Sequence, residues 1–132
     1  MEDPEDRPGV PFSTCGMCKR TWRGPEDLLP DPDLRLLGLQ SYAKTPDTNL
    51  VVFEHRCGST VSVLAKRLRH LLPLEECVTD AEVLFDTETC RGYCRTLEDF
   101  RSCDRPCANA RDRRLLRLLL ELRGDRRGKI GR

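Results

Sequence analysis

Eight cysteines and two histidines are the residues of this 132-residue chain best suited to chemistry. A first group opens with Cys15 and Cys18, a C-x-x-C pair, and closes with His55 and Cys57. Three thiols and one imidazole make a complete tetrahedral ligand set, and this mixture of sulfur and nitrogen favours zinc over iron. The pattern therefore predicts a metal site formed by these four residues. The alternatives are buried free cysteines beside a surface histidine, or Cys77 in place of His55.

A second group, Cys90, Cys94, Cys103 and Cys107, reads C-x3-C-x8-C-x3-C. Four thiols at this spacing could close a second zinc site, hold an iron–sulfur cluster or form two disulfides. Gly92 disfavours regular helix within the first pair, so ligands on loops are expected as much as ligands on helical turns. The spacing is not the usual iron–sulfur run, which makes a cluster the secondary choice. We predict metal ligation here and leave the metal open.

The remaining cysteine and histidine do not indicate catalysis. Cys77 follows Glu75 and Glu76, whose negative charge disfavours a reactive thiolate, and His70 lies in a basic stretch where solvation is expected. The sequence contains no catalytic Cys–His pair, nucleophile elbow, phosphate loop or dinucleotide fingerprint. Each metal group also offers a full ligand set with no coordination position left for water, so the protein is predicted not to be an enzyme.

Short strands and turns must bring these distant residues together. Apolar, β-branched or alternating stretches predict strands, and apolar residues at helical spacing predict helices. The expected elements are a tight turn at 13–18, a helical turn at 25–29, strands at 34–42, 50–53 and 60–63, a helix at 64–72, a short strand near 83–85 and a helix at 108–123.

These elements predict a small α+β protein, in which a zinc-ribbon-like antiparallel hairpin or meander precedes a cysteine-clamped loop and a C-terminal amphipathic helix. Leu115, Leu118, Leu119 and Leu122 form one stripe of that helix. The expected divisions are a disordered lead-in at 1–12, a zinc-ribbon-like module with a short helix at 13–72, a cysteine-rich segment with the helix packed on it at 73–123, and a basic tail at 124–132.

The composition explains why such a chain would need a metal. Charged residues make up 34% and aromatic residues 5%, which leaves little for a core, and a bound metal adds folding free energy. The net charge of +1 gives no global field that would select nucleic acid or membrane. Neither a secretory signal nor a membrane span is recognisable, so a cytoplasmic location is expected, where paired cysteines hold metal more often than they form disulfides.

The predicted function is a zinc-binding module that binds or regulates a protein partner, with one or two zinc ions and no membrane partner. The first alternative is a redox or iron–sulfur sensor, in which oxidation of the second cysteine group releases the helix. The second is a nucleic-acid binder that uses the basic C-terminus. The bases concerned are Arg111, Arg113, Arg114, Arg117, Arg123, Arg126, Arg127 and Lys129.

The order of the motifs resembles that of a poorly characterised bacterial cysteine-rich family. The C-x-x-C pair is followed by FEHRCGST at 53–60, CRGYC at 90–94 and CDRPC at 103–107, where the family reads FxHxCG[ST]T, CxGYC and CxxxC. The resemblance covers roughly residues 15–122. It implies a small cytoplasmic metal-binding protein and brings no activity with it. One departure is Asn109, two residues after Cys107, where the family pattern has a further cysteine.

Overall fold

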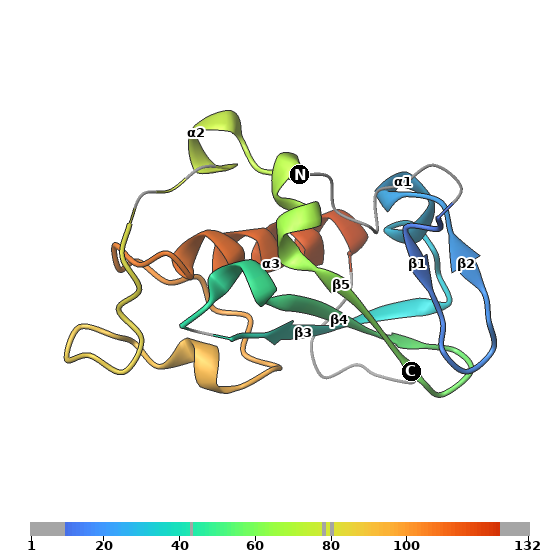
Figure 1. Ribbon diagram of the computed structural model, residues 1–132, viewed down its shortest axis with the longest axis horizontal. Helices are drawn as coiled ribbons and strands as arrows, with labels where there is room; N and C mark the ends of the chain where they lie inside the picture. The colour runs from blue at the N-terminus through green and yellow to red at the C-terminus, as the bar shows by residue number, and fades with distance from the viewer. Residues whose placement is uncertain (1–9, 43, 78, 80, 125–132) are drawn as a thin grey trace.

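Two small antiparallel sheets and a C-terminal helix dominate residues 10–42, 44–77, 79 and 81–124, which the computed structural model describes (Figure 1). This arrangement confirms the predicted α+β class. The first sheet pairs β1 (Ser13–Thr14) with β2 (Thr21–Trp22), and the second has the order β3 (Leu34–Gln40), β4 (Leu50–His55), β5 (Thr60–Leu64). The helices are α1 (Pro25–Leu28), α2 (Leu74–Cys77) and α3 (Ala110–Arg123), and 3₁₀ turns lie at Pro46–Thr48, Ala65–Arg67, Arg69–Leu71 and Tyr93–Arg95.

One face of the three-stranded sheet is apolar because side chains alternate along its strands. In β5, Val61 and Val63 are buried while the residues between and before them are exposed, as a period of two requires. β3 departs from this period. A bulge between Leu36 and Gly38 inserts a residue, so that Leu36 and Leu39 both join the core although they are three positions apart.

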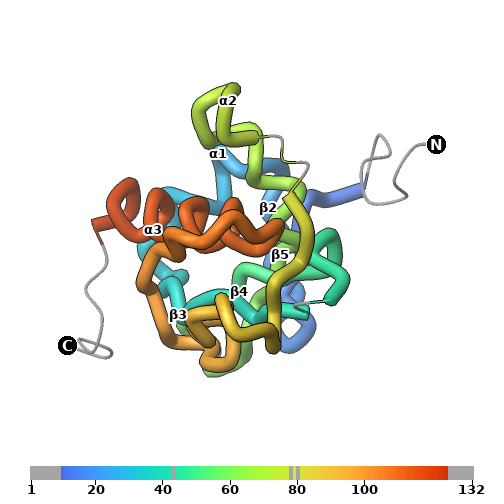
Figure 2. Tube along the Cα trace, turned by 90° about the vertical axis from the view of Figure 1, so that its left-hand side faces the viewer, coloured from blue at the N-terminus to red at the C-terminus, as the bar shows by residue number. Residues whose placement is uncertain are grey.

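α3 crosses this apolar face and completes the core (Figures 1 and 2). Leu115, Leu116 and Leu119 are fully buried, in one cluster with the side chains of the sheet. The predicted stripe is wrong at Leu122, which is 62% exposed. The leucine-rich sequence supports two overlapping stripes, and the helix is rotated toward the one that also buries Asp112.

A buried ion pair fixes the position of α3 on the sheet. Asp112, which is 0% exposed, accepts hydrogen bonds from Nε and Nη2 of Arg69, each at 2.8 Å, and from Nδ2 of Asn49 at 2.8 Å. Arg69 also donates to the exposed carboxylate of Asp47 at 2.8 Å. Buried charges persist only when they are paired in this way, so the contact links α3 to the start of β4 and to the turn at Arg69–Leu71.

Two predicted elements differ from the structure. Residues 64–72 form two 3₁₀ turns rather than one helix, because Leu68 has φ −113° and ψ −5° and interrupts the helical run. This break leaves Ala65 and Leu68 in the core while Arg69 reaches Asp112. No strand forms over the described residues 81–90. The backbone N–H of Leu84 there donates to the sulfur of Cys107.

The cysteine-rich segment, defined here as residues 81–109, follows α2 and packs against β3. The backbone N–H of Leu39 donates to the carbonyl oxygen of Leu97 at 3.0 Å. Gly38 has φ +155°, and a Cβ placed on it would lie 1.8 Å from the Leu97 oxygen, so this approach requires glycine. Phe100, from the same segment, is buried in the core.

The chain ends are described only in part. Residues 1–9 of the expected lead-in and 125–132 of the expected basic tail lie outside the described residues. Phe12 packs against the core, and its carbonyl oxygen accepts a hydrogen bond from Arg67 at 2.8 Å.

Candidate metal centre

The turn between β1 and β2 places Cys15 and Cys18 side by side. The backbone N–H of Cys15 donates to the carbonyl of Arg20 at 2.7 Å, and the N–H of Lys19 donates back to the carbonyl of Cys15 at 3.0 Å. Lys19 has φ +68°, a left-handed conformation that reverses the chain directly after Cys18. The turn predicted for residues 13–18 is therefore confirmed after Cys15, whereas Ser13 and Thr14 belong to β1.

The turn between β4 and β5 carries the other two residues. His55 is the last residue of β4, and its backbone N–H donates to the carbonyl of Ser59 at 2.8 Å. The N–H of Gly58 donates to the carbonyl of His55, and Gly58 has φ +96°, which glycine adopts without strain. Cys57 therefore projects from the tip of this turn.

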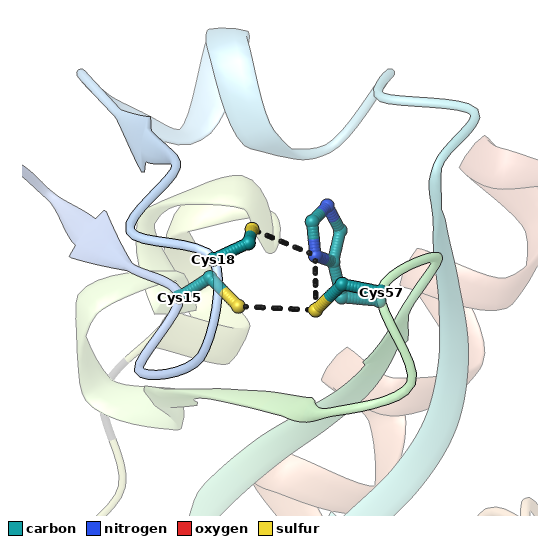
Figure 3. A group of neighbouring side chains, drawn as sticks. Cys15, Cys18 and Cys57 are labelled. Carbon is teal, nitrogen blue, oxygen red and sulfur yellow. Dashed lines mark hydrogen bonds between the residues drawn. The ribbon is translucent and has the colours of Figure 1, made fainter.

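Figure 3 shows Cys15, Cys18 and Cys57 pointing toward one another. His55 is the fourth member of this group. The Cys15 and Cys57 sulfurs are 3.5 Å apart, and Nδ1 of His55 lies 3.6 Å from the Cys18 sulfur and 3.1 Å from that of Cys57. All four ligand atoms lie within 4.8 Å of one another. The predicted first group is thus brought together, and it could hold a metal ion.

Hydrogen-bond donors favour the charged form of two of these thiols. The backbone N–H of Cys18 and the hydroxyl of Ser59 lower the pKa of Cys15 to about 5. Ser59, through its hydroxyl and its backbone N–H, also lowers the pKa of Cys57. The N–H of Arg20 acts to lower the pKa of Cys18, but desolvation and the neighbouring thiols raise it overall. The cluster is therefore prepared to carry negative charge, which a cation would neutralise.

The ring of Trp22 packs against the imidazole of His55. Burial acts to lower the pKa of His55, but hydrogen bonding to Cys57 and Cys15 raises it overall. Its ring meets the ring of Trp22 edge-on, with centroids 5.4 Å apart and an interplanar angle of 86°. Trp22 is fully buried, and its Nε1 donates to Asp31 at 2.8 Å. This packing restricts the ring orientation that turns Nδ1 toward the sulfurs.

Ser59 and Trp22 are not predicted from the sequence as members of this site. A hydroxyl two residues after a ligand in a tight turn can donate to sulfur, and the order Cys57, Gly58, Ser59 carries that signal. The Ser59 oxygen lies 3.0 Å from the Cys15 sulfur and 3.1 Å from that of Cys57. No local pattern indicates that Trp22 packs on His55, because the two meet only through the tertiary fold.

Cys77 does not take the place of His55. Its thiol donates to the backbone carbonyls of Arg69 and Leu72, at 3.1 and 3.2 Å, which places it in a separate structural role. His70 is exposed on the surface, as expected for a solvated histidine.

The second cysteine group surrounds a small cavity. Cys90, Cys94, Cys103 and Cys107 all line the same space, of about 20 Å³, and all four are free thiols. They lie on loops and on the turn at Tyr93–Arg95. Within the described chain, only the first group holds three or more ligand atoms as close together as a bound ion requires.

The predicted basic patch is largely engaged inside the protein. Arg113 is fully buried, Arg123 donates to the carbonyl oxygen of Leu34, and Arg114 pairs with Glu76 at 3.0 Å. Arg126, Arg127 and Lys129 lie outside the described residues.

None of the helices in the described ranges is long and apolar enough to cross a membrane. Comparisons with protein-family models, with curated proteins and with solved structures give no match for this chain.

Proposed function

We propose that this protein is a small zinc-stabilised module that binds or regulates a protein partner and does not catalyse a reaction. The observation that carries the proposal is the convergence of three sulfurs and Nδ1 of His55 within 4.8 Å, from two turns that are far apart in the sequence.

Zinc fits this donor set and its dimensions. Tetrahedral coordination with bonds of about 2.3 Å to sulfur and 2.0 Å to nitrogen separates the ligand atoms by about 3.5–3.8 Å. The separations of 3.5 and 3.6 Å agree with these values, and the 3.1 Å between His55 and Cys57 would open slightly. Three thiolates with one imidazole suit zinc better than harder cations, which prefer oxygen.

The support for a structural rather than a catalytic role is the number of ligands. Four protein groups complete a tetrahedron, so no coordination position would remain for a reactive water. The two ligand turns sit at the ends of the β1–β2 and β4–β5 hairpins, an arrangement in keeping with a zinc-ribbon-like centre. A bound ion would join the N-terminal hairpin to the main sheet and contribute folding free energy.

The proposed contact with a partner involves the metal-binding turn. Met17, between the first two ligands, is 66% exposed, and the side chain of Arg56 on the opposite turn is 81% exposed. Arg56 pairs with Asp33 at 3.6 Å but stays largely exposed, so the two turns offer a partner one apolar side chain and one base.

Metal analysis of the full-length chain, purified under reducing conditions, tests the proposal. Cys18→Ser should lose about one zinc per chain, because an exposed thiol can be removed without disturbing the core. Cys77→Ser is the matched control, since a serine hydroxyl can donate to the same two carbonyls, and it should keep its zinc. Equal zinc content in wild type and Cys18→Ser, or thermal unfolding of the wild type that a strong chelator leaves unchanged, would contradict the proposal.

A further inference from the structure

We propose a second metal site, in which Cys90, Cys94, Cys103 and Cys107 bind a single zinc ion next to the buried guanidinium of Arg113. The four thiols come from loops of the cysteine-rich segment and line one cavity at the start of α3. This site shares no ligand with the Cys15 cluster and does not depend on it.

The sulfurs of this group already accept hydrogen bonds from amide groups. The backbone N–H of Leu84 donates to the sulfur of Cys107 at 3.2 Å, and the N–H of Gly92 donates to that of Cys90 at 3.4 Å. Donors of this kind stabilise thiolate charge and orient the ligands of structural metal sites. Because Gly92 has φ +82°, the chain can turn back over Cys90 to make this contact.

Arg113 carries a buried positive charge and shares its carboxylate partner, Asp99, with Arg101. Its side chain is 0% exposed, and its donors reach backbone carbonyls of Asp99 and Arg101 and, at 3.4 Å, the carboxylate of Asp99. That carboxylate is itself bound at 2.7 Å by Arg101. Nη1 of Arg113 has no hydrogen-bond partner among the described residues. A buried cation left in this state is costly unless negative charge lies close by.

The cysteines are the available source of that charge. Cys94 and Cys103 are both near enough for negative charge on their sulfurs to act on the guanidinium. Four thiolates around Zn²⁺ carry a net charge of about −2, which would compensate Arg113 where neutral thiols cannot.

The cavity and the spacing of the cysteines suit a single ion. A volume of about 20 Å³ holds roughly one water-sized species. One zinc ion is compatible with that volume. The C-x3-C spacing of both pairs also differs from the usual iron–sulfur run. Among the described residues only the Cys15 cluster already meets the closeness that a bound ion requires, so binding at the second group is expected to draw its loops inward.

Metal stoichiometry of the full-length protein is the first test. Wild type and Cys77→Ser should bind about two zinc ions, and Cys18→Ser and Cys94→Ser about one each. Replacement by cobalt(II) should give a sulfur-to-metal absorption that is stronger per ion in Cys18→Ser, where four thiolates remain around it, than in Cys94→Ser. A single ion in wild type that Cys94→Ser retains would overturn the second site and leave the first intact. Iron with visible absorption, or disulfides among these four cysteines after reducing purification, would overturn it too.

Alkylation followed by mass spectrometry keeps the test valid if Cys94→Ser fails to fold. In the zinc-loaded wild type, all four cysteines of the second group should resist a thiol reagent, and prolonged chelation should make them reactive. Arg113→Met should weaken zinc binding at this group by about 10–100-fold, while Arg113→Lys weakens it less. Circular dichroism reports whether these variants fold. Unchanged affinity in a folded Arg113→Met would refute the role of the guanidinium.

Discussion

The contrast between Asp112 and Asp47 gives the sharpest test of the fold, because both carboxylates bind the same arginine. Asp112 is 0% exposed and accepts two hydrogen bonds from Arg69, whereas the side chain of Asp47 is 76% exposed and accepts one. Asp112→Asn removes the buried partner and leaves the guanidinium with only the exposed carboxylate of Asp47 to balance its charge. The expected loss in the free energy of unfolding is about 3–5 kcal/mol. Asp47→Asn should cost at most about 1 kcal/mol, since exposed ion pairs contribute little.

Urea unfolding of zinc-saturated protein at pH 7, followed by circular dichroism, measures both variants. For a chain of this size, a loss of 3–5 kcal/mol should move the midpoint by about 2 M. The double variant Arg69→Met/Asp112→Leu should recover part of the loss, because it removes the unpaired charge together with its partner. Equal midpoints for Asp112→Asn and Asp47→Asn would show that the buried ion pair contributes no more than the exposed one. A double variant less stable than Asp112→Asn would show that the buried cation is not the cause of the loss.

Three further predictions follow from the same structure. Gly38→Ala should lower the free energy of unfolding by about 3 kcal/mol or more, because the new Cβ would lie 1.8 Å from a backbone oxygen. Gly16→Ala is the control: its Cβ would meet nothing within 4 Å, so urea unfolding should show a change of at most about 0.5 kcal/mol. Hydrogen bonding from Arg101 is the main cause that lowers the pKa of Asp99 to about 2. The Asp99 carboxylate therefore contributes about 2 kcal/mol to the free energy of unfolding above pH 4, and this contribution is lost as the pH falls toward 2. Asp99→Asn should reduce the loss in the free energy of unfolding between pH 4 and pH 2. An unchanged loss over this range would exclude Asp99 as its cause. Trp22, the single tryptophan, packs on the metal-site imidazole, so chelation should change its fluorescence, and a constant spectrum would argue against a metal there.

The first metal cluster could be predicted because the two members of each ligand pair are close together in the sequence. Cys15 and Cys18 lie in one turn, His55 and Cys57 in another, and each pair has the spacing that a shared ion requires. The strands around them followed from apolar alternation, which depends on neighbouring residues alone. What the pattern could not give was the identity of Ser59 as a donor to two sulfurs, which depends on how the turns face each other.

The remaining differences arise where distant residues decide local structure. Arg69 and Asp112 are 43 positions apart, yet their contact rotates α3 and accompanies the break of the expected helix at Leu68. The bulge at Gly38 accommodates the cysteine-rich segment, which comes much later in the chain. The secondary-structure propensities of residues and the periodicity of apolar positions cannot predict such pairings, because tertiary contacts override both.

The contact between Leu39 and Leu97 also bears on how the protein avoids self-association. β3 is a seven-residue, leucine-rich strand at the edge of its sheet. An exposed edge strand can pair with a strand of another molecule. The cysteine-rich segment occupies part of that edge, so release of the segment would uncover it. Light scattering that grows with protein concentration after thiol alkylation would be the visible sign, and clear solutions at every concentration would show that the edge is protected by other means.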